Sequence, residues 1–250
     1  MQFNFHGDYS QEDKKLFINA QEDDLKRICD YLKTNMVLVQ NICFEIFDTR
    51  EGKQDADPNH SISRASARFK EMTVYRFWSP TEDPHFPHET THLVAHIWGK
   101  PYILDTELDT WDNKKLKKEV EMVSTSFMQE GLAIAVDDIV FNRELMEDGE
   151  FKSIDKWCVE QLGHMPENLS SVINLDGFGS YPNKIVVPFA ASFSKFLLKN
   201  GGVEKYKKMY VQIKEILSPH KNVEVIEGVY IQTDEELLTA WKNLILKSTK

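Results

Sequence analysis

The sequence predicts an α+β fold, and two observations carry that prediction. Three segments rich in β-branched and aromatic residues, 37–48, 62–69 and 72–78, fall within the first eighty residues. From Pro80 onward the apolar residues recur at helical spacing instead. Strands that come first and helices that follow, without strict alternation, indicate α+β rather than α/β. A hydrophobic content of 41% over 250 residues is enough for a full core.

The elements of the N-terminal part are predicted from periodicity and from capping residues. Apolar residues among charges at 11–35 predict one or two amphipathic helices. The three strands predict a small antiparallel or mixed sheet, which we expect to be largely antiparallel. Thr81 or Asp83 is the expected N-cap of the next helix, which Gly99 and Pro101 would end.

The remainder of the chain is predicted to be mainly helical. Thr233, with Glu236 three residues later, forms a capping-box pattern before an amphipathic tail. The glycine pair at 201–202 is expected to end a helix. Predicted helices span 113–123, 125–142, 151–162, 188–202, 203–217 and 233–247, and a loop spans 175–184. The chain is therefore interpreted as a single domain, 1–250, with an α+β lobe at 1–100 and a helical lobe at 101–250.

The net charge and the cysteine content indicate which classes of binding partner and which cellular compartment to expect. A formal net charge of −10 disfavours nucleic acid and anionic membrane surfaces, both of which require clustered positive charge. No apolar run approaches the roughly 20 residues that span a bilayer, and no secretory signal is visible. Three scattered cysteines without a CxxC pair indicate neither a disulfide framework nor a thiolate zinc site. These features predict a cytoplasmic protein with no membrane or nucleic-acid partner.

The stretch HFPHETTHLVAHIW, residues 85–98, contains an HExxH motif on a predicted helix. Residues four apart on a helix differ by about 40° in direction and about 6 Å in height, so His88 and His92 can converge on one ion. Zinc accepts two such nitrogens. Glu89 lies on the flank of the same face, where it can reach a metal-bound water without being a ligand. The motif predicts a zinc site with Glu89 as general base and acid.

A hydrolytic zinc site needs a third protein ligand and one open position. His96 lies about 12 Å along the helix from His88, too far for both to share one ion with His92, so we interpret it as a packed or second-shell residue. Glu130 is an acid on an otherwise apolar predicted helix, a costly placement unless the carboxylate is paired or metal-bound. Alternatively, Glu130 faces water at a helix end. With HExxH present we predict Glu130 as the third ligand.

These motifs, in their order along the chain, resemble a known family. HETTH, QEGLA, a Tyr/Pro loop, PFAASFSKFLLKNGGVEKY and DEELLTAWKNLI together are similar to the gluzincin zinc metallopeptidases, in particular the small thermolysin-like, peptidase MA-like catalytic domains. The resemblance covers roughly residues 70–245. It implies a thermolysin-like catalytic domain with one Zn²⁺ per chain, bound by His88, His92 and Glu130. It also implies Asp137 as an acid near the site.

The sequence departs from this family at three places. The spacing between His92 and Glu130 is longer than in aminopeptidase relatives and predicts an insertion at 100–124. The GxMEN-like loop that holds a substrate amine in aminopeptidases is absent before HExxH, which leaves endo- and exopeptidase activity open. Phe189 stands where relatives carry the tyrosine that stabilises the oxyanion. Tyr181 is the predicted replacement, and His164 and Tyr210 are alternatives.

The predicted function is zinc-dependent hydrolysis of peptide bonds in a peptide or protein substrate. Glu89 would take a proton from water bound to zinc and deliver it to the leaving amine. An exposed strand, 62–69 or 72–78, would pair with an extended substrate. The alternative is an inactive zinc-binding scaffold or interaction protein derived from a metallopeptidase. The oligomeric state is left open.

Overall fold

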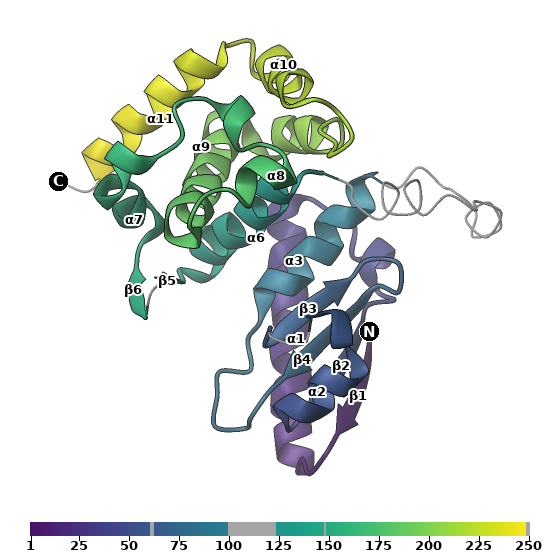
Figure 1. Ribbon diagram of the computed structural model, residues 1–250. Coiled ribbons are helices and arrows are strands. Elements are labelled where there is room, and N and C mark those ends of the chain that lie inside the picture. The colour runs from purple at the N-terminus through teal and green to yellow at the C-terminus, as the bar shows by residue number, and fades with distance from the viewer. Residues whose placement is uncertain (61–62, 100–123, 148, 249–250) are drawn as a thin grey trace. The chain divides into compact units, whose positions relative to one another are not determined.

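The computed structural model describes residues 1–60, 63–99, 124–147 and 149–248, and it divides into two compact units (Figure 1). Unit 1 is Met1–Ile97 and unit 2 is Trp98–Lys250. Unit 1 contains a small sheet with helices and unit 2 is mainly helical, so the predicted α+β class is confirmed. The predicted helix at 113–123, and all but Ser124 of the predicted insertion, lie outside the described residues.

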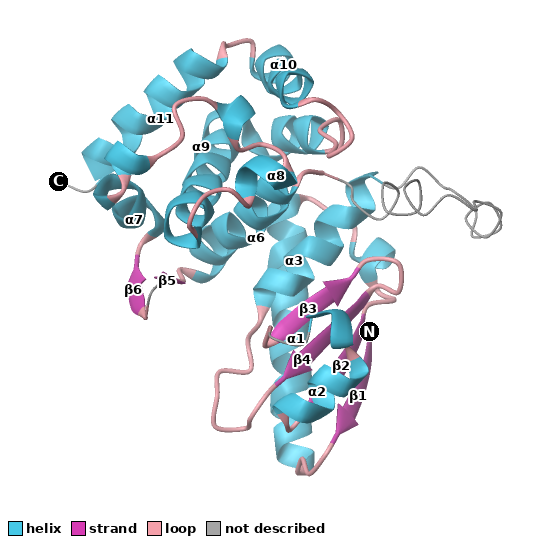
Figure 2. Ribbon diagram, viewed as in Figure 1, coloured by secondary structure: helices cyan, strands magenta, loops and turns pink. Residues whose placement is uncertain are grey.

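Unit 1 contains a four-stranded mixed sheet in the order β1-β2-β4-β3. Strands β1 and β2 pair in parallel, as do β2 and β4, whereas β3 and β4 are antiparallel. Figure 2 shows α2 on one side of this sheet and α1 on the other. The elements are β1 (Gln2–His6), α1 (Gln11–Leu32), a 3₁₀ turn (Met36–Val39), β2 (Cys43–Phe47), α2 (Arg50–Ala56), a 3₁₀ turn (Pro58–His60), β3 (Ala65–Arg68), β4 (Thr73–Phe77) and α3 (Pro87–His96).

The prediction of a largely antiparallel sheet is wrong, and the mixed sheet that was its alternative is confirmed. Strand β1 was not predicted, and β2 pairs in parallel with β4 instead of antiparallel with β3. Helix α1 joins β1 to β2 and supplies the long connection that a parallel pair requires. The strand predicted at 37–48 is also shorter than expected. Residues Met36–Val39 form a 3₁₀ turn, in which the Asn35 side chain caps the backbone N–H of Val37, and only Cys43–Phe47 are extended.

Helix α1 follows the predicted amphipathic pattern as one continuous helix. Ser10 and Asp13 form a capping box at its start. Its apolar stripe is buried, and Phe17 on that stripe contacts Phe44 of β2 and Trp78 in an aromatic core. This cluster anchors α1 to the sheet and so places the α1 residues that later contact the start of α3.

Helix α3 carries the HExxH motif and begins later than predicted. Neither Thr81 nor Asp83 caps it, because the chain remains irregular up to Phe86, which takes the N-cap position without a side-chain hydrogen bond. Asp83 instead accepts a hydrogen bond from the backbone N–H of His85. Pro87 occupies the first turn, where its missing N–H costs nothing. A 3₁₀ turn, Ile97–Gly99, follows the helix.

Unit 2 is built around α6 and α9. The predicted break after Gly201 is confirmed, since Gly202 has φ 75° and ψ 168° inside a segment that is otherwise helical. The elements are α6 (Ser126–Phe141), β5 (Leu145–Glu147), β6 (Glu150–Lys152), α7 (Ile154–Glu160), 3₁₀ turns at Leu162–His164 and Leu169–Ser171, α8 (Leu175–Phe178), α9 (Asn183–Tyr210), α10 (Pro219–Tyr230) and α11 (Asp234–Ser248).

Several elements of unit 2 differ from the predictions. The predicted loop at 175–184 contains α8 and the first residues of α9, and α10 was not predicted. The predicted helix at 151–162 begins only at Ile154, because β6 pairs with β5 in a hairpin. The predicted capping box of the tail is confirmed: Thr233 and Glu236 each accept a hydrogen bond from the other's backbone N–H. None of the described helices is long and apolar enough to cross a lipid bilayer.

Candidate metal centre

Helix α3 brings the two histidines of the HExxH motif together. The Nε2 atoms of His88 and His92 lie 3.1 Å apart, and the two rings are nearly perpendicular, with centroids 4.8 Å apart. His92 is buried and His88 is half-buried. The i, i+4 spacing therefore directs both nitrogens to one point, as the motif predicts.

The separation of these two nitrogens fits a single metal ion. If both lie roughly 2.05 Å from one ion, 3.1 Å between them corresponds to a nitrogen–metal–nitrogen angle of about 98°. A tetrahedral ion prefers about 109°, so an increase of only a few tenths of an ångström in their separation would give the ideal angle. The pair can therefore act as two ligands without rebuilding the helix.

Glu89 lies on the flank of the same helix turn. Its side chain is half-buried, whereas the next two residues, Thr90 and Thr91, are buried. A carboxylate in this position keeps access to water while a neighbouring histidine pair holds an ion. The arrangement of α3 is thus compatible with Glu89 as a proton carrier.

Phe69 packs against the histidines of α3 and was not predicted to do so. It follows strand β3, and its ring stacks on that of His96 at 5.0 Å and meets that of His92 edge-on at 6.3 Å. His96 is buried in this contact, consistent with its interpretation as a packed histidine. Sequence periodicity gave no signal for Phe69, because the contact joins a strand end to a helix 23 residues later.

Glu130, the predicted third ligand, lies on α6 in unit 2. It is half-buried, whereas its neighbours Met128, Gln129 and Gly131 are buried. Tyr210 of α9 is close enough to interact electrostatically with Glu130. Burial raises the pKa of Tyr210 well above its ordinary value, and the negative charge of Glu130 raises it further. Tyr210 is therefore a neutral phenol beside this carboxylate.

Gly131, the residue after Glu130, lies where α6 packs against α9. A Cβ at Gly131 would lie 2.5 Å from the backbone oxygen of Ala190 and 2.5 Å from Ser194 Oγ, both on α9. The missing side chain therefore serves the contact of α6 with α9, next to Glu130.

The remaining predicted site residues lie in different surroundings within unit 2. Tyr181 is half-buried in the segment between α8 and α9. Asp137 is half-buried on α6, seven residues after Glu130. Phe189 is fully buried and contacts the rings of Phe127 and Trp241 at 5.3 and 4.9 Å. Phe189 is thus a core residue with no hydroxyl to offer a substrate.

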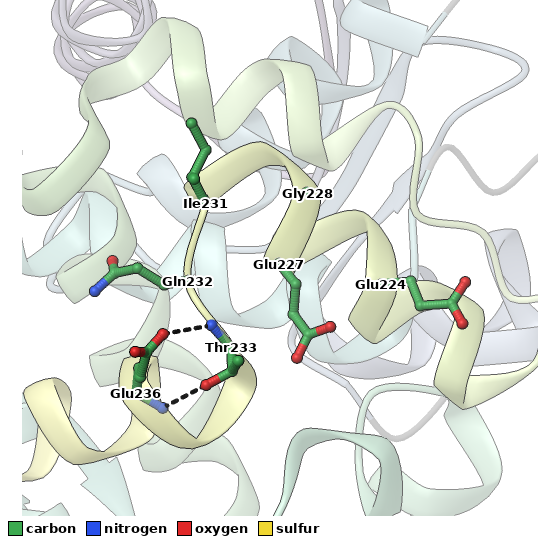
Figure 3. Close-up of a pocket in the computed structure, with 7 residues that line it drawn as sticks. All are labelled: Glu224, Glu227, Gly228, Ile231, Gln232, Thr233 and Glu236. Atoms are coloured by element: carbon green, nitrogen blue, oxygen red, sulfur yellow. Dashed lines mark hydrogen bonds between the residues drawn. The ribbon is translucent and has the colours of Figure 1, made fainter.

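A shallow hollow of about 450 Å³ lies between α10 and α11 (Figure 3). It is lined by Glu224, Glu227, Gly228, Ile231, Gln232, Thr233 and Glu236. Two of its carboxylates cap the start of α11: Glu236 accepts from the N–H of Thr233, and Glu227 accepts from the N–H of Asp234. This acidic hollow is therefore explained by helix capping, and its lining residues include no histidine or cysteine.

No family model matches the chain, and no curated protein matches it.

Proposed function

We propose that this protein is a zinc-dependent metallopeptidase. The observation that carries the proposal is the convergence of the His88 and His92 Nε2 atoms, 3.1 Å apart, on a helix that also carries Glu89. The order of sequence motifs, which resembles that of gluzincin peptidases, supports the same function. The proposal assigns the protein to the hydrolases that act on peptide bonds.

In this proposal His88, His92 and Glu130 bind one metal ion. Two imidazole nitrogens and one carboxylate are a donor set that can hold such an ion. This set suits zinc and leaves one coordination position open for water or substrate. Zinc, when bound to such a set, lowers the pKa of its water to about 7 and polarises a substrate carbonyl.

Glu89 would carry the proton during hydrolysis. Its half-buried carboxylate can accept a proton from the attacking water and deliver it to the amine that leaves. Because one group performs both transfers, no second acid is needed on α3. Tyr181 remains the proposed donor to the oxyanion, since Phe189 has no hydroxyl group.

Strand β3 is the proposed docking edge for an extended peptide. It is the last strand in the sheet order β1-β2-β4-β3, so one side of its backbone has no strand partner among the described residues of unit 1. The strand belongs to the same unit as α3, and Phe69 directly after it contacts two α3 histidines. Backbone pairing at this edge would bind substrates with little regard to their sequence.

The second candidate is a zinc-binding scaffold without turnover. The burial of Phe189 among aromatic rings favours it, because this is where the resemblance places a catalytic tyrosine. Glu89 argues against it, since a structural zinc site has no use for a general base and usually closes its fourth position with cysteine or histidine.

The test measures zinc per chain and hydrolysis of casein for wild type, Glu89→Gln, Glu130→Ala and Glu71→Ala. Glu71 is an exposed glutamate in the turn between β3 and β4 and serves as the matched control. A peptidase gives one zinc per chain and turnover in wild type and Glu71→Ala. It gives zinc without turnover in Glu89→Gln and weakened zinc binding in Glu130→Ala. Full zinc occupancy without cleavage would favour the scaffold, and absence of zinc would refute both.

A further inference from the structure

Three buried polar side chains hold the segment that leads into the HExxH helix. Gln21 and Asp24 on α1 are fully buried, and Arg76 on β4 is 7% exposed. All three contact residues 83–86, directly before Pro87 begins α3. We call Gln21, Asp24 and Arg76 the anchor.

Asp24 makes the contacts closest to the helix. Its Oδ2 atom accepts a hydrogen bond from the backbone N–H of Phe86 at 2.8 Å, and its Oδ1 atom lies 2.7 Å from Nδ1 of His85. Both oxygens of a fully buried carboxylate are thus used on two consecutive residues.

Gln21 and Arg76 hold the carbonyl groups just upstream. Gln21 Nε2 donates to the backbone oxygen of Pro84 at 2.5 Å. Arg76 donates to the same oxygen at 3.3 Å and to the backbone oxygen of Asp83 at 3.1 Å. The Arg76 guanidinium also lies over the ring of Phe86 at 4.2 Å. The segment is therefore fixed by its backbone and by its side chains.

This fixation matters because His88 lies in the first turn of a short helix. Helix α3 has ten residues, and its N-cap, Phe86, makes no side-chain hydrogen bond. Helices of this length are marginal alone, and their first turn frays unless the N-terminal N–H groups find partners. When that turn frays, His88 leaves the position in which its nitrogen meets that of His92.

We infer that Asp24 is a positioning residue for metal binding, which keeps the first turn of α3 formed and so holds His88 opposite His92. The inference rests on the proposed metal site, but its mechanism is confined to unit 1. Metal ions bind more weakly when the competent conformation is only partly populated, and residues that orient ligands typically contribute about 10- to 100-fold in affinity.

The matched control is the neighbouring aspartate. Asp23 is also on α1, but its side chain is 53% exposed and pairs with Arg27 of the same helix at 3.6 Å. Ile28→Ala, in the buried face of α1, controls for a general loss of stability. Asp24→Asn is the milder variant, because its amide oxygen can still accept from the N–H of Phe86. It keeps the test valid if Asp24→Ala fails to fold.

Two measurements test the inference. Zinc affinity, from competition with a chelator, should fall about 10- to 100-fold in Asp24→Ala, fall less in Asp24→Asn, and stay within twofold of wild type in Asp23→Ala and Ile28→Ala. In metal-free protein, amide hydrogen exchange at Thr91 and His92, which a formed first turn protects, should accelerate at least about tenfold in Asp24→Ala alone.

The outcomes separate this inference from the proposed function. Wild type that binds zinc, with unchanged affinity in Asp24→Ala, would overturn the positioning role and leave the metal site standing. Wild type that binds no zinc would overturn the proposed function, and the exchange rates would still show whether Asp24 holds the first turn. Equal loss of affinity in Asp24→Ala and Ile28→Ala would reduce Asp24 to a stabilising residue.

Discussion

Replacing Gly131 with alanine probes a close contact between α6 and α9. The added Cβ would lie 2.5 Å from the backbone oxygen of Ala190, where ordinary contacts are 3.4–4 Å, so the helices must separate by about 0.9 Å. The other contact, Ser194 Oγ, accepts a buried hydrogen bond from Tyr206 and is not free to rotate away. Overpacking of this kind destabilises the fold by about 1–3 kcal/mol, and the higher helix propensity of alanine offsets about 1 kcal/mol of that. We therefore expect the free energy of unfolding to fall by up to about 2 kcal/mol.

Gly228→Ala is the matched control for this substitution. Gly228 lies inside α10, and a Cβ there would meet nothing within 4 Å. Without a steric clash, only the gain in helix propensity remains, so the free energy of unfolding should rise by up to about 1 kcal/mol. Urea unfolding followed by far-ultraviolet circular dichroism measures both variants, and zinc affinity should fall only in Gly131→Ala, which displaces the adjacent Glu130. Gly131→Ala as stable as Gly228→Ala would refute the packing argument.

Two further predictions concern unit 1 and the thiols. Burial alone would raise the pKa of Asp57. Hydrogen bonds to its carboxylate, including one from Lys53, have the larger effect and hold this pKa below its ordinary value of 3.8. Its stabilising effect is therefore present above pH 3.8 and lost as the pH falls through the folded-state pKa. Asp57→Ala should lower the free energy of unfolding by about 3–5 kcal/mol, measured by urea unfolding at pH 7, because it leaves Lys53 buried without its carboxylate partner. A decrease below about 1 kcal/mol would contradict this prediction. Cys43 should react with a thiol reagent before Cys29 and Cys158, because it alone is half-buried. Burial, with the charge of a nearby glutamate, raises its pKa to about 11, so it should react more slowly than a free thiol, as peptide mapping over time would show.

The sequence predicted best those features that depend on neighbours in the chain. His88 and His92 are four residues apart, so helical geometry alone brings their nitrogens together. The capping box at Thr233 and the helix break after Gly201 are equally local. Such features need only the backbone geometry of one element, which periodicity and capping residues specify.

Features that depend on distant pairing were missed or wrong. Strand β1 is only five residues long, and it becomes a strand by pairing with β2 some forty residues later. Its omission, together with the unforeseen parallel pairing of β2 with β4, explains why the sheet was predicted to be antiparallel. The anchor contact between Asp24 and Phe86 joins residues 62 apart, and the one between Gln21 and Pro84 joins residues 63 apart. Helical spacing places Asp24 with Phe17 and Ile28 on the buried face of α1, whereas Asp23 beside it faces water, but nothing local identifies Phe86 as the partner of Asp24.

The contacts of His85 and His96, the other two histidines in residues 85–98, help to distinguish the proposed enzyme from the proposed scaffold. A structural zinc site closes its four positions with protein ligands, usually cysteine or histidine. His85 is held by Asp24 at 2.7 Å, and His96 stacks on Phe69 at 5.0 Å. Either would have to give up a buried contact to serve as a fourth ligand. This packing argues against either histidine as a fourth ligand, so it supports the proposed metallopeptidase, which needs one position open beside Glu89, over the closed scaffold.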